Sequence, residues 1–211
     1  IEDPVEKNLS GINQTQVNPT AGLTFDVGLR ALMRQDPDII MVGETRDGET
    51  AGTSVRAAIT GHMVLSTLHT NDAVSSIVRL EDMGVETYLV ANSLVGLIAQ
   101  RLLRKVCQNC AKEVETTEQE RILLGEDVCT VKRGMGCSQC NHTGYRGRIA
   151  VHEILAINQD IRRMIMEHES VENITKYARE HQHMRTLKES GLILVKEGVT
   201  TPEELMKISY E

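Results

Sequence analysis

The stretch Asp36-Pro-Asp-Ile-Ile-Met-Val-Gly-Glu-Thr-Arg-Asp47 decides the fold, because a short apolar run ends there abruptly in polar residues. Four consecutive apolar residues, 39–42, are too few for a helix and are typical of a strand that helices cover on both faces, as in a parallel α/β sheet. Ligands bind at the carboxyl ends of such strands. Glu44 is therefore expected where a metal-bound phosphate or a reacting water would lie. An ordinary polar turn from strand to helix explains the same residues equally well.

A second strand of the same kind follows. Residues 48–60 have helical periodicity and stop at Gly61, and the apolar run 63–68 ends in the polar group His69-Thr-Asn-Asp72. Right-handed crossovers between parallel strands would bring Glu44 and His69 to one edge of the sheet. An imidazole at that edge could donate a hydrogen bond to a phosphate oxygen, although a lone histidine is more often structural.

Charged residues upstream could reach the same edge. Glu2, Asp3 and Glu6 stand close together where a strand would leave the sheet, and one of them could orient a water for attack on phosphorus. A solvated turn bent at Pro4 is the alternative. Thr24 is a plausible N-cap for a helix that carries two arginines one turn apart, Arg30 and Arg34. Such a pair usually forms a solvated face, and it gains interest only where phosphate is near.

The composition excludes some classes of protein. The 211 residues carry a net charge of -7 and include only 4 Tyr, 1 Phe and 0 Trp, which argues against a nucleic-acid surface. No apolar run approaches the length that spans a bilayer, and no segment has the pattern of a signal peptide. We expect a cytoplasmic protein. Because the chain begins at Ile1, inside what reads as a strand, we also expect it to be a fragment of a longer one.

Four of the five cysteines form two C-x-x-C knuckles, which are Cys107, Cys110, Cys137 and Cys140. Two such knuckles supply four thiolates to one tetrahedral ion, and zinc suits that donor set. In a cytosolic chain this interpretation is favoured over disulfides or idle thiols. Four ligands leave no open position, so the ion is expected to stabilise the fold. Neither Cys129 nor His142 is expected to coordinate, although His142 could replace a thiolate.

The remaining periodicity predicts further elements. A helix over 85–99 leads into a strand over 97–106, a short helix lies between the knuckles at 117–124, and a strand covers 149–155. The rest is helical, over 159–168, 170–181, 186–196 and a last helix that begins at Thr201. There Thr201 and Glu204 have the spacing of a capping box, with Pro202 at the first helical position.

These motifs together resemble the secretion ATPase superfamily. Residues 1–6 look like its aspartate box, Asp36–Asp47 like its Walker B segment, and Ser66–Ala73 like its histidine box. The paired knuckles are similar to those of the assembly ATPases of type II secretion and type IV pili, the GspE/PilB group. The chain has no G-x-x-x-x-G-K-[ST] loop. In that family the loop lies upstream of the aspartate box, so the resemblance implies the C-terminal part of the protein.

The resemblance implies a fold and a division of the chain. It predicts the C-terminal part of an α/β RecA-like P-loop ATPase core over residues 1–106, a tetracysteine zinc-binding subdomain over 107–144, and a mostly helical subdomain over 145–211. It also assigns roles. Glu44 matches the Walker B glutamate of the Mg2+ shell, Glu6 the glutamate that polarises the attacking water, and His69 the histidine near the γ-phosphate. The resemblance also implies that Arg30, Arg34 and Asp3 contact the nucleotide.

The function implied by the resemblance is ATP hydrolysis with Mg2+ in a homo-hexameric ring. The ring would drive pseudopilus or pilus assembly through an inner-membrane platform protein, so the chain would be peripheral to that membrane. A fragment without the phosphate-binding loop would be inactive alone. Two alternatives stay open at this point: an ATP-incompetent interaction module stapled by zinc, and a related DNA-uptake motor. Within the family, no binding of nucleic acid is expected.

Overall fold

The computed structural model describes residues 1–208, which form two compact units. Unit 1 contains Ile1–Leu97 and Ala156–Tyr177, and unit 2 contains Ile98–Leu155 and the chain from Ala178 onward. The division at residues 106 and 144 expected from the sequence stays a prediction. Within the described part of the chain, no helix is both long and apolar enough to cross a membrane.

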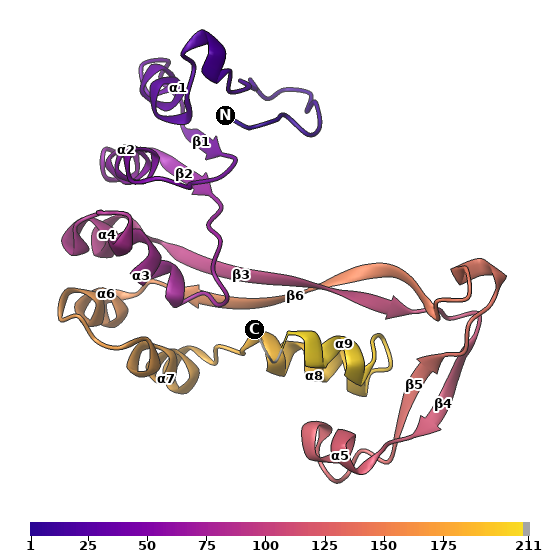
Figure 1. Cartoon of the computed structure of the whole chain (residues 1–211). Coiled ribbons are helices and arrows are strands. Elements are labelled where there is room, and N and C mark those ends of the chain that lie inside the picture. Colours follow the sequence, from indigo (N-terminus) through magenta and orange to yellow (C-terminus); the bar gives the residue numbers. More distant parts are fainter. Residues whose placement is uncertain (209–211) are drawn as a thin grey trace. The chain divides into compact units, whose positions relative to one another are not determined.

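The elements follow the order that the periodicity predicts, with a few shifts (Figure 1). The helices are α1 (Phe25–Leu32), α2 (Gly48–Ile59), α3 (Ser75–Asp82), α4 (Thr87–Ser93), α5 (Glu118–Leu124), α6 (Gln159–Met166), α7 (Val171–Gln182), α8 (Leu187–Lys196) and α9 (Pro202–Lys207), with short 3-10 turns η1 (Pro19–Ala21) and η2 (Ser138–Cys140). The strands are β1 (Ile39–Val42), β2 (Met63–Ser66), β3 (Gly96–Val106), β4 (Ala111–Glu115), β5 (Thr130–Gly134) and β6 (Tyr145–Ala156).

Unit 1 is built around the parallel pair β1 and β2, in which Ile39 is opposite Met63 and Val42 is opposite Ser66. The first residue extends this pair: the Ile1 amino group donates to Met41 O at 2.7 Å, and Gly43 N donates to Ile1 O at 2.8 Å. This alternation of bonds is that of a parallel ladder. The N-terminal segment therefore lies beside β1, at the strand end that leads to Glu44.

One face of β1 is covered within residues 1–208. Ile40 and Val42 are buried with Leu29 of α1, and α1 and α2 lie along this side of the strand pair (Figure 1). Side chains alternate along a strand, so Ile39 and Met41 point to the opposite face, where they are 64% and 45% exposed. The expectation that helices cover both faces is therefore wrong for the described part of the chain.

Local caps set the ends of the helices around this strand pair. Thr24 Oγ1 accepts from Val27 N at 3.3 Å and begins α1, as the sequence predicts. Asp47 Oδ1 accepts from Thr50 N at 2.8 Å and begins α2 directly after the Glu44 turn. Gly61 adopts a φ of 105° after α2, a conformation that favours glycine. The turns at both strand ends are thereby held short.

The predicted helix over 85–99 is too long. α4 ends at Ser93, and its C-cap Leu94 is already extended, with a ψ of 134°. β3 begins at Gly96, and exposure alternates from Ile98 to Ala99 to Gln100 as in a strand. The strand expected over 149–155 likewise begins sooner, at Tyr145, and ends at Ala156.

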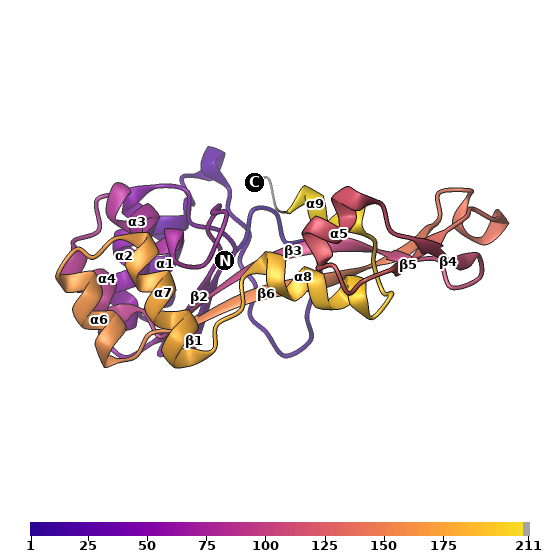
Figure 2. The same cartoon turned by 90° about the horizontal axis from the view of Figure 1, so that it is seen from below.

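Unit 2 contains the antiparallel hairpin of β4 and β5, whose two strands lie side by side with α5 between them in the sequence (Figure 2). α8 and α9 pack on each other, and their buried side chains join those of α5 and β5 in one core. This core consists of Leu124, Val131, Val195 and Leu205. β3 pairs with β6, and the cysteine knuckles lie between these strands and the hairpin.

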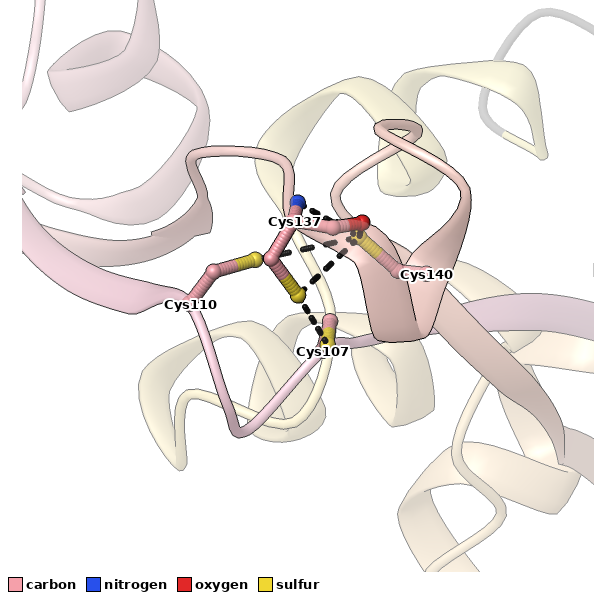
Figure 3. Close-up of side chains that lie close together, drawn as sticks. All are labelled: Cys107, Cys110, Cys137 and Cys140. Atoms are coloured by element: carbon pink, nitrogen blue, oxygen red, sulfur yellow. Dashed lines mark hydrogen bonds between the residues drawn. The ribbon is translucent and has the colours of Figure 1, made fainter.

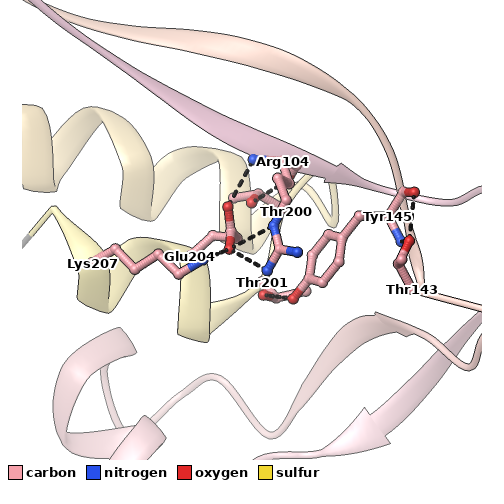
Figure 4. Close-up of polar contacts among 7 residues, drawn as sticks. All are labelled: Arg104, Thr143, Tyr145, Thr200, Thr201, Glu204 and Lys207. Atoms are coloured by element: carbon pink, nitrogen blue, oxygen red, sulfur yellow. Dashed lines mark hydrogen bonds and ion pairs between the residues drawn. The ribbon is translucent and has the colours of Figure 1, made fainter.

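The start of α9 differs from the predicted capping box. Thr201 forms no cap bond, and its hydroxyl lies 2.9 Å from the Tyr145 hydroxyl instead (Figure 4). Glu204 accepts bonds from Arg104 N at 2.9 Å and from Lys207 Nζ at 2.6 Å. The Arg104 guanidinium adds two bonds to the same carboxylate, at 3.0 and 2.8 Å. Long-range partners thus replaced the local cap, because Glu204 is buried and needs charge compensation.

Candidate functional site

Glu44 and His69 meet at the carboxyl ends of β1 and β2. Glu44 Oε2 lies 3.6 Å from His69 Nε2, as parallel strands joined by right-handed crossovers predict. Arg46 Nε donates to the same Glu44 oxygen. The Glu44 side chain is only 14% exposed, whereas those of His69 and Arg46 are 82% and 68% exposed. The shielded carboxylate of Glu44 thus accepts from Arg46 and lies near His69, and both of these groups face solvent.

Three hydrogen bonds fix the polar strand ends on either side of Glu44. Thr45 N donates to Thr67 O at 2.9 Å, the hydroxyls of Thr45 and Ser66 lie 2.8 Å apart, and Thr67 Oγ1 donates to Gly43 O at 2.7 Å. These bonds hold the backbone around Glu44 against the segment that leads to His69. Local sequence patterns did not predict these bonds, although hydroxyl residues follow both apolar runs.

Gly43 lets the N-terminal segment approach β1. A Cβ on this residue would lie 3.2 Å from Glu2 Cα and 3.3 Å from Ile1 O, which is tighter than ordinary van der Waals contact. A larger side chain at this position would therefore push residues 1 and 2 away from the strand. The close approach of residues 1 and 2 to β1 therefore explains why a glycine suits position 43.

The carboxylates of residues 1–6 are held unequally. Glu2 is fixed, because Gln14 Nε2 donates to its Oε2 at 3.0 Å and its backbone pairs with Thr15 and Val17. Asp3 and Glu6 are exposed. Within residues 1–208 neither forms a hydrogen bond or an ion pair, so the structure brings neither into direct contact with Glu44 or His69. Their expected roles stay predictions.

Arg30 of α1 and Arg34, which lies just beyond the end of that helix, have different surroundings. Arg30 Nε donates to the carboxylate of Asp26 at 2.9 and 3.1 Å, whereas the Arg34 side chain is exposed and forms no hydrogen bond or ion pair with any described residue. Asp26 escaped the sequence analysis, although its position one turn before Arg30 is the usual signal for such a pair. Neither arginine is bonded to Glu44 or His69 in the described structure.

The four knuckle cysteines converge on one point in unit 2 (Figure 3). Their sulfur atoms all lie within 4.8 Å of one another, with Cys107 to Cys137 and Cys110 to Cys140 both at 3.9 Å. A tetrahedral zinc ion with Zn–S bonds of about 2.3 Å needs sulfurs about 3.8 Å apart, whereas a disulfide needs about 2.05 Å. The spacing therefore fits one zinc ion and excludes disulfides among these residues.

The surroundings shift the pKa values of two knuckle cysteines in opposite directions. Asn109 Nδ2 donates to Cys137 Sγ at 3.3 Å, and this bond is the main cause that lowers the pKa of Cys137 to about 6. Burial of Cys110 raises the pKa of that thiol to about 11. Backbone pairing positions the knuckles, since Cys107 N donates to Gly144 O at 2.9 Å and Met135 N donates to Cys110 O at 3.0 Å. The donor set and its surroundings fit structural zinc.

Comparison with known families agrees with this geometry. Residues 1–207 match the family described as type II/IV secretion system protein. The chain belongs to this family. It is 49% identical over 216 residues to the type IV pilus assembly ATPase PilB of Thermus thermophilus, and 44% identical over 214 residues to the type II secretion system protein E of Aeromonas hydrophila. The matches cover 100% of the chain but 24% and 42% of these two relatives, so the chain spans less than half of their length.

Solved structures confirm the fold class. The pilus retraction motor PilT with bound ADP matches with a TM-score of 0.71 at 30% identity, over 100% of this chain and 51% of that one. The Legionella pneumophila ATPase DotB matches with a TM-score of 0.62 at 22% identity, which shows the fold alone. The predicted α/β RecA-like fold with a tetracysteine cluster and the predicted GspE/PilB group are therefore both confirmed.

Proposed function

We propose that this chain is part of an ATPase that hydrolyses ATP to drive assembly of a type II secretion pseudopilus or a type IV pilus. The observation that carries the proposal is the meeting of Glu44 and His69, 3.6 Å apart, at the carboxyl edge of a parallel strand pair. Membership of a family whose relatives are secretion and pilus ATPases supports the same reaction.

Each charged residue has a proposed role in this reaction. Bound Mg2+ would neutralise charge on the phosphates and polarise them. Glu44 would hold a water of the metal shell, and His69 would donate to a γ-phosphate oxygen. Glu6 would orient the attacking water, and Asp3 would face the nucleotide beside it. Arg30 and Arg34 would donate to phosphate oxygens, at this site or at the site of a neighbouring subunit.

We propose that nucleotide binding needs residues beyond this chain. No G-x-x-x-x-G-K-[ST] loop occurs in the sequence, and the relatives are more than twice as long. The 211 residues alone would then be inactive. The whole protein would act as a cytoplasmic homo-hexamer, peripheral to the inner membrane through a platform protein, and would bind no nucleic acid.

The cysteine cluster has a structural role in this proposal. Zn2+ held by Cys107, Cys110, Cys137 and Cys140 would fix the tip of β3, the start of β6 and the β4–β5 hairpin relative to one another within unit 2. The zinc-binding region is proposed to contact the platform protein, because phosphate chemistry does not require it.

ATP hydrolysis by the full-length protein tests the proposed reaction. The wild type should turn over ATP with Mg2+, and Glu44→Gln, which keeps the shape of the side chain, should lower kcat by about 100-fold or more. Asp82→Asn on the exposed side of α3 is the matched control and should change little. Undiminished hydrolysis by Glu44→Gln would refute the role of this edge. A full-length protein without any turnover would favour the interaction module, and salt-dependent DNA binding would favour a DNA motor.

A further inference from the structure

Asp26 of α1 connects two helices to one of the proposed phosphate-binding arginines. Its Oδ1 accepts a hydrogen bond from Thr53 Oγ1 of α2 at 2.6 Å. Arg30 Nε donates to both carboxylate oxygens, at 3.1 and 2.9 Å. Thr53 is buried and the Asp26 side chain is 14% exposed, so the carboxylate is fixed at the contact between α1 and α2. Arg30 itself is 62% exposed.

This arrangement orients the Arg30 guanidinium and leaves most of its N–H donors available for a ligand. A guanidinium has five N–H donors, and Asp26 takes only the one on Nε. The other four, on Nη1 and Nη2, form no hydrogen bond with any residue in 1–208, and paired N–H groups of this kind bind phosphate in a bidentate manner. The Arg34 side chain, just beyond the C-terminal end of α1, has no such support in the described structure.

A plain surface ion pair would not explain the contact with Thr53. Exposed pairs between residues one helical turn apart contribute little and are readily exchanged for water. Here the buried hydroxyl of Thr53 on α2 fixes the Asp26 carboxylate, and that carboxylate in turn fixes the Arg30 guanidinium. Burial alone would raise the pKa of Asp26, but the bonds from Thr53 and Arg30 lower it below the ordinary value, so the carboxylate stays ionised at neutral pH.

We propose that Asp26 is a positioning residue, which with Thr53 holds Arg30 ready to donate to a nucleotide phosphate and so distinguishes Arg30 from Arg34. The inference rests on the proposed ATPase function. An arginine side chain has many rotamers, and ordering it before the substrate binds removes an entropic cost from the reaction. Arg30 is then the preorganised donor of α1.

The test measures kcat and KM for ATP in the full-length protein. Arg30→Ala should lower kcat by about 100-fold or more, as loss of an arginine donor does in related phosphoryl transfer. Asp26→Ala should lower kcat by about 10-fold, because a misplaced group loses part of its effect. The double variant should be no slower than Arg30→Ala, since both changes remove the same interaction.

Conservative variants separate positioning from folding. Asp26→Asn keeps the side-chain shape, and Thr53→Val removes only the hydroxyl donor. Both should lower kcat several-fold while the protein stays folded and keeps its hexamer size at the assay temperature, with a melting temperature lowered by only a few degrees. Thr53→Ser, which keeps the hydroxyl donor, should restore activity. Asp82→Asn, an exposed carboxylate change on α3, is the control for a lost surface charge.

The outcomes distinguish this inference from the proposed function. An Arg30→Ala protein with normal kcat would refute a phosphate role for Arg30 and the inference with it, while the effect of Glu44→Gln would still test the ATPase assignment. A slow Arg30→Ala beside a normal or faster Asp26→Ala would overturn positioning alone. So would a double variant slowed by the product of the two single effects, because that would mean that the residues act independently.

Discussion

The Arg104 guanidinium lies over the ring of Tyr145, 4.0 Å from its centroid, and also donates 2.8 Å to Glu204, which is 100 positions away in the sequence. Arg104 is near the end of β3 and Tyr145 is the first residue of β6, so the pair stands at the base of the cysteine knuckles. Thr200 Oγ1 adds a bond to Arg104 O at 2.8 Å. The start of α9 is thereby anchored to the two strands that carry the zinc-binding region.

Glu204→Gln should destabilise unit 2. The amide cannot balance the charge of Arg104, and it leaves hydrogen bonds of a buried side chain unmade, since the Glu204 side chain is only 3% exposed. Because the Arg104 side chain is 45% exposed and water screens part of its charge, we expect a loss of about 1–2 kcal/mol in unfolding free energy. Urea unfolding measures the loss in unfolding free energy, and hydrogen exchange of the α9 amides shows whether the loss is at this anchor. Glu197→Gln at the exposed end of α8 is the matched control, and equal stability of the two variants would contradict the prediction.

Acid should weaken the same anchor. Burial of Glu204 raises its pKa, but the hydrogen bonds from Arg104 and Lys207 outweigh it and lower the pKa from 4.5 to about 2. A carboxyl with a depressed folded pKa contributes its full stability above the unfolded value and loses it as the pH falls through the folded value. The free energy of unfolding should therefore drop between pH 4.5 and about 2. In Glu204→Gln this part of the drop should vanish, and an unchanged pH dependence would exclude the assignment.

Zinc removal tests the cysteine cluster. The protein should carry one zinc ion per chain, measured by mass spectrometry of the metal, and Cys140→Ser should lose it, because a tetrahedral site needs all four thiolates. Cys129→Ser should keep the metal, since Cys129 is exposed and outside the cluster. A chelator should also increase hydrogen exchange in the β4–β5 hairpin. If the hairpin amides exchange no faster in zinc-free protein than in zinc-bound protein, the ion does not stabilise the fold.

The sequence predicted the elements and one edge of the site, because both follow from local rules. Apolar runs, caps and the parallel βα order were enough to place Glu44 near His69. Exposure of Ile39 was not predictable, since an uninterrupted apolar run does not show which face the described helices cover. Glu204 took Arg104 as its partner across 100 positions, a contact that no local pattern contains. The Asp26–Arg30 pair had a local signal at helical spacing and was overlooked.

Gly43→Ala adds only one methyl group but should lower both the stability and the activity of the protein. The new Cβ would lie 3.2 Å from Glu2 Cα and 3.3 Å from Ile1 O, and both are backbone atoms that move only with the N-terminal segment. We expect a loss of about 1–3 kcal/mol in unfolding free energy, typical of overpacking, together with a lower kcat in the full-length protein.

Gly52→Ala in α2 is the matched control for that change. Its Cβ would meet only the flexible end of Arg56, at 3.3 Å, and alanine favours a helix interior by up to about 1 kcal/mol over glycine. This variant should be as stable as the wild type or more so. The two proteins are compared by urea unfolding and ATP turnover. Since both changes add one methyl group, equal effects would mean that the contact between residues 1 and 2 and β1 does not constrain position 43.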